Sequence, residues 1–342
     1  MNQHWQQWVA GNQGRISHDG YVEFADGIAQ VAAVRQGDVL ALLDKLRLIR
    51  VEGEDAQAFL QSQLSSDIRE LSNSQAQYSS YSTAKGRMLA SFLICQQQGG
   101  YLLLLAADIA EAVAKRLSMF VMRSKVKVAL LAADQMTIAG VRGNKAEQKV
   151  KDHFAAGAVL PMSVLHAEQE LAIALPGGGF VVLLGEDAPL QAVLLQEPFH
   201  AVDANSWAIR DIDAGIAWVT LATQEQFVPQ MANMEVIGAV SFKKGCYPGQ
   251  EIVARTQYLG KLKRRLFKVR IRQFTSAGSK LFSPELPEQA IGMVAAVCAV
   301  DNDRYEALVV VQSACWEKGI YLEPEYLSGL ECLALPYSTQ DE

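Results

Sequence analysis

The stretch LRLIRVEGEDAQAFLQSQL, residues 46–64, holds the first clear strand and helix of the chain. Its first six residues are rich in Leu, Ile and Val, which favours a strand. Gly53 breaks that strand, and Asp55 can then cap a helix. The apolar face of this helix would consist of Ala56, Phe59, Leu60 and Leu64. The stretch therefore predicts a strand, a turn and a helix.

Two more strands, a helix and a last strand follow. Residues 87–95 and 101–106 are β-rich runs around a Gln- and Gly-containing loop, which is typical of a hairpin. Asp108 can cap a second helix, whose apolar residues recur at helical spacing from Ile109 to Val121. Residues 125–128 alternate as in a strand. The predicted order, β-α-β-β-α-β, is that of a ferredoxin-like unit.

The remainder predicts a second hairpin and a small all-β unit. The runs at 170–174 and 180–184 are joined by Pro176-Gly177-Gly178-Gly179, which lacks the Lys-Ser/Thr of a nucleotide-binding loop, so we interpret it as a hairpin turn. Short alternating runs follow from Arg265. We expect three units: residues 1–135 with 200–260, residues 136–199, and residues 261–342.

The composition is that of a folded globular protein. The 342 residues include 31 Lys and Arg against 37 Asp and Glu, a formal charge of −6, with 50% hydrophobic residues. A single core stops growing near ~250–300 residues, so two or three domains are expected. The acidic balance argues against a surface that is basic throughout and coats nucleic acid or membranes.

The five cysteines are scattered and form no metal-binding pattern. Neither a CxxC pair nor a nearby histidine completes a zinc site, so no metal is expected. The odd number of cysteines and the polar start of the chain indicate a cytoplasmic protein. The longest apolar run, residues 290–300, is shorter than a membrane helix requires.

The segment SFKKGCYPGQE, residues 241–251, presents a thiol between glycines and beside two lysines. Ammonium groups nearby favour the thiolate, so Cys246 is the cysteine with a local reason to be reactive. The alternative is a buried structural cysteine. No histidine lies close enough in sequence to be assigned as its base.

A run without acidic residues follows this segment, between Glu251 and Glu285. It contains nine positive charges: Arg255, Lys261, Lys263, Arg264, Arg265, Lys268, Arg270, Arg272 and Lys280. The run is either a solvated strand face or an anion site for a polyglutamyl tail, RNA phosphate or an acidic partner. Direct RNA contact through residues 255–280 is thus one expectation.

Trp207 opens a segment in which an indole is followed by Asp211 and Asp213. A flat heteroaromatic ligand needs an aromatic surface and a carboxylate that accepts its N–H groups. A partly buried tryptophan with exposed aspartates at a helix end is the alternative.

Several motifs together resemble the YgfZ family of folate-binding proteins, relatives of the glycine-cleavage aminomethyltransferase (GcvT-like). Residues 241–255 match the family signature closely, above all Lys244, Gly245, Cys246, Tyr247 and the Gly-Gln-Glu that follows. Further matching motifs lie at 51–53, 59–67, 84–87, 207–215, 227–233 and 335–338. The resemblance covers most of the chain, more loosely between residues 140 and 196.

The family resemblance implies an α+β fold with two ferredoxin-like domains around a central cavity, plus a C-terminal small β-barrel. It implies tetrahydrofolate as the ligand. Trp207 matches a folate-contacting tryptophan of the family, Asp213 is a weaker candidate, and Leu46 occupies the position of a second such tryptophan. The hallmark cysteine is Cys246, and Lys244, Gly245, Tyr247, Gly249, Gln250 and Glu251 surround it.

The family function implied is that of a folate-binding accessory factor. It would support iron–sulfur cluster maintenance in enzymes that modify tRNA, and thereby tRNA processing, notably methylthiolation. Where the aminomethyltransferases carry an Asp-Asp pair, this chain has Ala90-Ser91, and Ala90 cannot move a proton. We therefore expect a non-enzymatic role; a folate-dependent one-carbon transferase or demethylase is the alternative.

Overall fold

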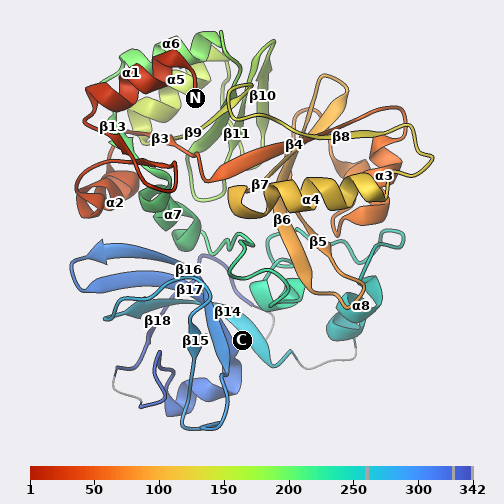
Figure 1. Cartoon of the computed structure of the whole chain (residues 1–342), viewed down its shortest axis with the longest axis vertical. Helices are drawn as coiled ribbons and strands as arrows, with labels where there is room; N and C mark the ends of the chain where they lie inside the picture. The colour runs from red at the N-terminus through yellow and green to blue at the C-terminus, as the bar shows by residue number, and fades with distance from the viewer. Residues whose placement is uncertain (259–261, 326–327, 340–342) are drawn as a thin grey trace.

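The computed structural model describes residues 1–258, 262–325 and 328–339. It contains two large sheets with helices packed beside them and a C-terminal sheet below them (Figure 1). No helix in this described part is long and apolar enough to cross a membrane.

The first sheet is built around the stretch at residues 46–64. Its strand order is β5-β6-β7-β4-β8, and all its pairings are antiparallel. Helices α3 and α4 belong to this unit, and α4 runs across the sheet (Figure 1). The elements are β4 (Leu46–Glu52), α3 (Ala56–Gln63), η1 (Ile68–Glu70), β5 (Gln77–Ser82), β6 (Met88–Gln97), β7 (Gly100–Ala106), α4 (Ala107–Met119) and β8 (Lys127–Leu130).

One strand of this sheet is absent from the predicted β-α-β-β-α-β order. β5 inserts between α3 and β6 and forms an edge of the sheet. Its sequence, QYSSYS, shows no alternation of apolar and polar residues, because serines (Ser79, Ser80 and Ser82) fill buried positions where apolar residues are usual. The Oγ atoms of Ser79 and Ser80 hydrogen-bond Ser66 and Ser65, which satisfies polar groups that burial would otherwise penalise.

The second sheet collects strands from distant parts of the chain, in the order β10-β11-β12-β9-β3-β13. The predicted hairpin at 170–184 is confirmed by β11 and β12. β3, from the range expected in the first unit, pairs with β9 of the second. Its elements are α1 (Gln3–Gly11), α2 (Gly27–Gln36), β3 (Val39–Leu42), β9 (Thr137–Arg142), α5 (Asn144–His153), β10 (Val164–Ala167), β11 (Glu170–Ala174), β12 (Phe180–Leu184), α6 (Pro189–Gln196), β13 (His200–Val202) and α7 (Ala204–Asp213), with the small β1 (Arg15–Ile16) and β2 (Val22–Glu23) beside them.

The C-terminal unit is a five-stranded antiparallel sheet, ordered β15-β16-β17-β14-β18. It curls as half of a barrel, and β15 and β18 are not paired with each other in the described residues. Its elements are β14 (Arg264–Ile271), β15 (Lys280–Leu281), β16 (Gly292–Asp301), β17 (Arg304–Gln312), η3 (Ser313–Lys318) and β18 (Glu331–Leu333). The segment before it contains η2 (Pro229–Ala232) and α8 (Gln250–Tyr258), and α8 lies beside the turn between β5 and β6. Helix α7 lies between this sheet and the upper sheets (Figure 1).

Candidate functional site

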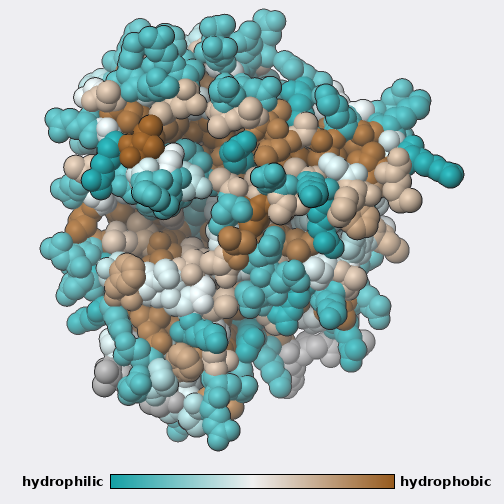
Figure 2. Space-filling view, in the orientation of Figure 1, coloured by the Kyte–Doolittle hydropathy of each residue, from teal (hydrophilic) through white to brown (hydrophobic). Residues whose placement is uncertain are grey.

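A cavity of about 230 Å³ lies between the first sheet, helix α7 and the C-terminal sheet. Leu46 at the start of β4, Trp207 on α7 and Val297 on β16 all line it. Two of the three positions that the family resemblance marked for ligand contact, Leu46 and Trp207, are thus brought to one cavity. In the orientation of Figure 1, hydrophobic surface shows within hollows across the middle of the molecule (Figure 2).

Helix α7 sets the position of the Trp207 indole. The carboxylate of Asp203 caps the helix by accepting a hydrogen bond from the Ser206 N–H. Trp207 is 3% exposed and packs on Gly140 of β9, where an added Cβ would lie 2.8 Å from three indole atoms. Because only glycine leaves room there, β9 fixes one side of the ring and the cavity borders the rest.

A second indole and a carboxylate complete this wall. Trp218 is half-buried and lines the cavity, and its Nε1–H donates to Asp211 Oδ2 at 2.9 Å. The buried Arg210 guanidinium pairs with Asp211 Oδ1 and donates to the Pro176 carbonyl in the β11–β12 turn. The Asp211 carboxylate is therefore held in place, close to both tryptophans.

Trp218 was not among the predicted ligand contacts, although a signal existed. It follows Asp211 by seven residues and lies just beyond the matched segment 207–215. A polar indole N–H usually finds an acceptor when it is buried, so the Trp-Asp spacing was a usable hint.

Asp213, the weaker of the predicted ligand contacts, does not line this cavity. Its Oδ1 accepts from Arg35 Nη2 at 2.7 Å and from Lys268 Nζ at 2.8 Å. Burial raises the pKa of this carboxyl, but the hydrogen bonds from Arg35 and Lys268 outweigh burial and leave the pKa below its ordinary value. Asp213 therefore joins elements together, and Asp211 is the carboxylate at the cavity.

Lys45 supplies the positive charge among the residues that line the cavity. Its side chain is exposed, and Nζ donates to Asn205 Oδ1 at 2.6 Å. An exposed ammonium beside an apolar hollow can meet an anionic group of a ligand that projects into solvent.

The Ala90-Ser91 pair lies next to residues 218–220, a segment that borders the 230 Å³ cavity. Both residues are buried on β6, and the Ser91 hydroxyl accepts a hydrogen bond from the Val219 N–H at 2.9 Å. Trp218 and Thr220, on either side of Val219, line the cavity. This position therefore holds a methyl group and a hydroxyl that is already bonded, with no carboxyl to transfer a proton.

The Cys246 loop lies elsewhere, against the first sheet. The Ser241 N–H donates to the Ser65 carbonyl at 2.9 Å. The Lys244 ammonium donates to the carbonyls of Leu64 and Ser66 at 2.6 and 2.8 Å, and burial lowers its pKa to about 8. Lys244 therefore anchors the loop, and its charge is engaged by carbonyl groups.

The rest of the motif shapes the turn. Gly249 has φ +83°, and an added Cβ would lie 2.5 Å from the Thr83 carbonyl oxygen. The ring of Tyr247 lies 5.2 Å from Lys244 Nζ, and burial raises the pKa of this phenol to about 12. Gln250 begins α8 and Glu251 is exposed in its first turn. These residues hold the loop that presents Cys246.

Exposure separates the cysteines into two groups. Cys95, Cys298 and Cys315 are buried, and burial raises the pKa of each thiol, to about 12 for Cys95 and Cys298. Cys246 and Cys332 are exposed. Residues 241–251 do not line the 230 Å³ cavity, so the thiol and the two tryptophans, Trp207 and Trp218, occupy different places. Within the described residues, no three His, Cys, Asp or Glu side chains gather as metal ligands would.

The basic run is partly neutralised. Arg265 pairs with Glu235, Lys268 with Asp213 and Glu306, and Arg270 with Glu331. Lys261 lies outside the described residues. The other described members are Arg255, Lys263, Arg264, Arg272 and Lys280. The nine charges of the sequence therefore do not form one uniform positive face.

The fold of the chain is similar to that of a solved aminomethyltransferase T. The glycine cleavage system aminomethyltransferase T of Bartonella henselae superposes with a TM-score of 0.79, covering 97% of this chain and 96% of that one at 18% identity. No family model matches the sequence.

Two curated proteins are similar to this chain in sequence over most of its length. The tRNA-modifying protein YgfZ of Klebsiella pneumoniae is 27% identical over 315 residues, 88% of this chain and 94% of that protein. The protein of that name from Cronobacter sakazakii is 28% identical over 327 residues, 91% of this chain and 96% of that protein. The resemblance to the YgfZ family is confirmed: the chain is a homologue of these proteins.

Proposed function

We propose that this protein is a cytoplasmic, tetrahydrofolate-binding accessory factor for tRNA modification. It would maintain iron–sulfur enzymes, notably those that methylthiolate tRNA. The name of the homologous tRNA-modifying proteins supports the tRNA role. The observation that carries the folate part is the cavity between β4, α7 and β16, with two indoles and one fixed carboxylate. In this proposal the two upper sheets are ferredoxin-like units around that cavity, and the C-terminal sheet is the family's barrel.

The chemistry of the cavity suits a reduced pterin. The ring is flat, partly apolar and edged with N–H donors, so it needs aromatic surfaces and an acceptor. Trp207 and Trp218 supply the surfaces, and Asp211 supplies the acceptor. Leu46 adds an aliphatic contact where the family carries tryptophan.

The cavity is large enough for the pterin ring but too small for the whole cofactor. Pockets that enclose a drug-sized ligand measure ~300–1,000 Å³. The 230 Å³ here is smaller, so the aminobenzoyl-glutamate tail would leave the cavity. Lys45, exposed at this cavity, would meet the carboxylates of that tail.

The exposed thiol would act toward a client and not on the bound pterin. Cys246 is presented by a loop anchored through Lys244 and turned by Gly249, away from the cavity lining. A single thiolate cannot hold a cluster that normally takes four, so we propose thiol exchange, redox cycling or transient ligation.

A folate-dependent one-carbon transferase is the second candidate, and the aminomethyltransferase-like fold is the observation in its favour. Ala90 and the bonded Ser91 weigh against it because neither can serve as an acid beside the cavity. Steady turnover of an aminomethylated or methylated donor by the purified protein would support this candidate over ours.

The experiment is a measurement of methylthiolated nucleosides in tRNA, by mass spectrometry, from cells that lack the gene and carry a plasmid copy. We expect wild type to restore these nucleosides and Cys246→Ala to restore less than a tenth of that level. Cys332→Ala, which removes the other exposed thiol, is the matched control and should behave as wild type. Full restoration by Cys246→Ala would refute the role of the thiol.

A further inference from the structure

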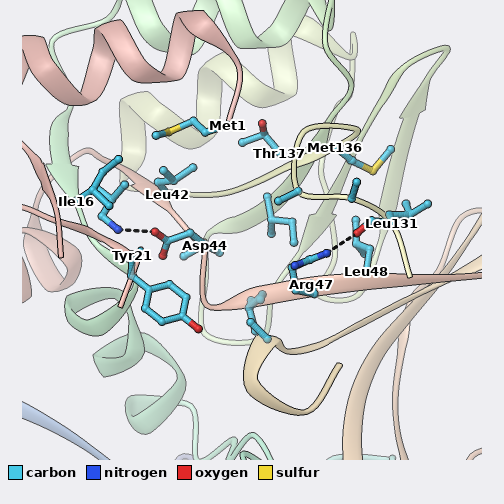
Figure 3. Close-up of a pocket in the computed structure, with 18 residues that line it drawn as sticks. Met1, Ile16, Tyr21, Leu42, Asp44, Arg47, Leu48, Leu131, Met136 and Thr137 are labelled. Carbon is cyan, nitrogen blue, oxygen red and sulfur yellow. Dashed lines mark hydrogen bonds between the residues drawn. The ribbon is translucent and has the colours of Figure 1, made fainter. Parts of the chain in front are cut away.

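A second cavity, of about 310 Å³, lies on the other side of Leu43 and Leu46 from the tryptophan cavity. These two leucines line both. The second cavity is bounded by the β1–β2 hairpin, the loop between β3 and β4, and the segment before β9 (Figure 3). Neither the family resemblance nor the proposed folate site uses it.

The walls of this cavity are largely aliphatic. The apolar side chains that Figure 3 labels around it are Met1, Ile16, Leu42, Leu48, Leu131 and Met136. Such walls favour a small molecule with an apolar body, and the volume is at the low end for a ligand pocket.

Asp44 is the exceptional group in these walls. Its Oδ2 accepts a hydrogen bond from the Val22 N–H at 2.6 Å, while its buried Oδ1 has no partner among the described residues. Burial raises the pKa of this carboxyl to about 6, against a lowering by the Val22 hydrogen bond and Lys45. A buried acceptor without a donor is costly. Because Asp44 lines the cavity, its carboxylate is the acidic group that a cation bound there would meet.

The two cations nearest in sequence, Lys45 and Arg47, do not neutralise Asp44. The Arg47 guanidinium lies on the opposite side of the cavity, where Nη2 donates to the Leu131 carbonyl at 2.8 Å (Figure 3). Lys45 is directed to Asn205 and the Tyr21 ring, and no ion pair joins either cation to Asp44 among the contacts of the described residues.

We propose that this cavity binds a small aliphatic amine, with its ammonium group on the Asp44 carboxylate and its hydrocarbon body against the leucines and methionines. A charge-assisted hydrogen bond to the carboxylate would be stronger than a neutral one, and the opposite charge would offset the burial of Asp44. The proposal does not depend on folate binding at the neighbouring cavity.

The test is a calorimetric titration of the full chain with three probes that share one body: isopentylamine, isopentanol and isovalerate. We expect saturable binding of the amine, with binding of the alcohol and the carboxylate weaker by tenfold or more. Equal affinity for all three, or no binding of the amine up to 10 mM, roughly the weak limit of specific affinity, would overturn the proposal.

Two variants place the site. Asp44→Asn keeps an acceptor for Val22 but removes the charge, and should weaken amine binding at least tenfold. Asp303→Asn, which removes one exposed carboxylate from the β16–β17 turn, should leave it unchanged. If Asp44→Asn does not fold, Ala133→Trp at the exposed edge of the cavity should block the amine instead. Unchanged affinity in a folded Asp44→Asn, or in Ala133→Trp where that variant is used, would refute this placement.

Discussion

Lys244 shows how one residue of the signature serves the fold. Lys244 is 6% exposed, and its ammonium joins the thiol loop to the carbonyls of Leu64 and Ser66. Lys244→Met would leave both buried carbonyls without this donor, at a cost of about 2 kcal/mol of unfolding free energy. Urea denaturation measures this cost. Lys243→Met, which changes the exposed neighbour, is the control and should remain within ~0.5 kcal/mol of wild type.

The pH dependence of this difference follows from the lowered pKa. The native lysine releases its proton near pH 8, whereas the unfolded one keeps it until about 10.5. The unfolded state therefore binds more protons between these values, and wild-type stability rises with pH there. We expect wild type to gain stability relative to Lys244→Met from pH 8 to 10. A constant difference across that window would contradict the burial of this ammonium.

Asp44 titrates with the opposite sign. Its native pKa is about 6 against an ordinary value of 3.8, so the native state binds more protons between pH 4 and 6 and loses stability as pH rises through that window. Asp44→Asn should therefore unfold at a higher temperature than wild type at pH 8, with a smaller gain at pH 5. Calorimetric melting at both values measures the effect, and Asp303→Asn should show no such gain.

At the scale of elements, the two glycines of the motif before α8, Gly245 and Gly249, have different structural roles. Gly249 combines φ +83° with contacts that leave no room for a Cβ, whereas a Cβ at Gly245 would meet no atom within 4 Å. Gly249→Ala should lose about 2 kcal/mol or more through left-handed backbone strain and collision. Gly245→Ala should keep wild-type stability. Equal melting temperatures for the two variants would contradict this geometry.

The elements also show what apolar periodicity can reveal. β4, α3, α4 and the β11–β12 hairpin were predictable because their apolar residues follow strand or helix spacing. β5 was not, because serines fill its buried positions and bond to other serines. Trp207 could be singled out from its neighbours in sequence, but only the packing of α7 on β9 and β16 brings it beside Leu46.

At the scale of the molecule, an ion-pair network joins the C-terminal sheet to the helices above it. Asp213 on α7 and Glu306 on β17 share Arg35 of α2 and Lys268 of β14. Glu306 is buried, so Glu306→Gln would leave these cations partly uncompensated and cost about 3 kcal/mol of unfolding free energy. Glu331→Gln, at the exposed pair with Arg270, should cost less than ~1 kcal/mol. Denaturant unfolding distinguishes the two; similar losses would refute the network.

The same network predicts acid sensitivity. Burial opposes ionisation of Asp213 and Glu306, but hydrogen bonds from Arg35 and the charge of Lys268 lower the pKa of both carboxyls. Their contribution is therefore present above the ordinary values of 3.8 and 4.5 and is lost as pH falls below them. Melting of wild type between pH 6 and 3 should show a loss of stability that Glu306→Gln shows less. Parallel curves would contradict the assignment.

The arrangement of the whole chain could be expected only in part. The acidic average concealed a basic run, as the sequence indicates, but the fold pairs three of its cations with carboxylates from other segments. β3 precedes the first sheet in the sequence and β13 follows it, yet the two strands pair with each other in the second sheet. Local sequence patterns do not encode such a pairing between distant segments. The 230 Å³ cavity likewise forms only when these distant segments come together.

The most direct test of the account is a titration of the purified full chain with tetrahydrofolate, followed by intrinsic tryptophan fluorescence and confirmed by calorimetry. We expect saturable binding in wild type and affinity weakened at least tenfold in Trp207→Ala and in Trp218→Ala, with Trp316→Phe in the C-terminal unit as the unchanged control. Unaltered calorimetric affinity in folded Trp207→Ala and Trp218→Ala, or no binding by wild type, would contradict the assignment of this cavity to folate.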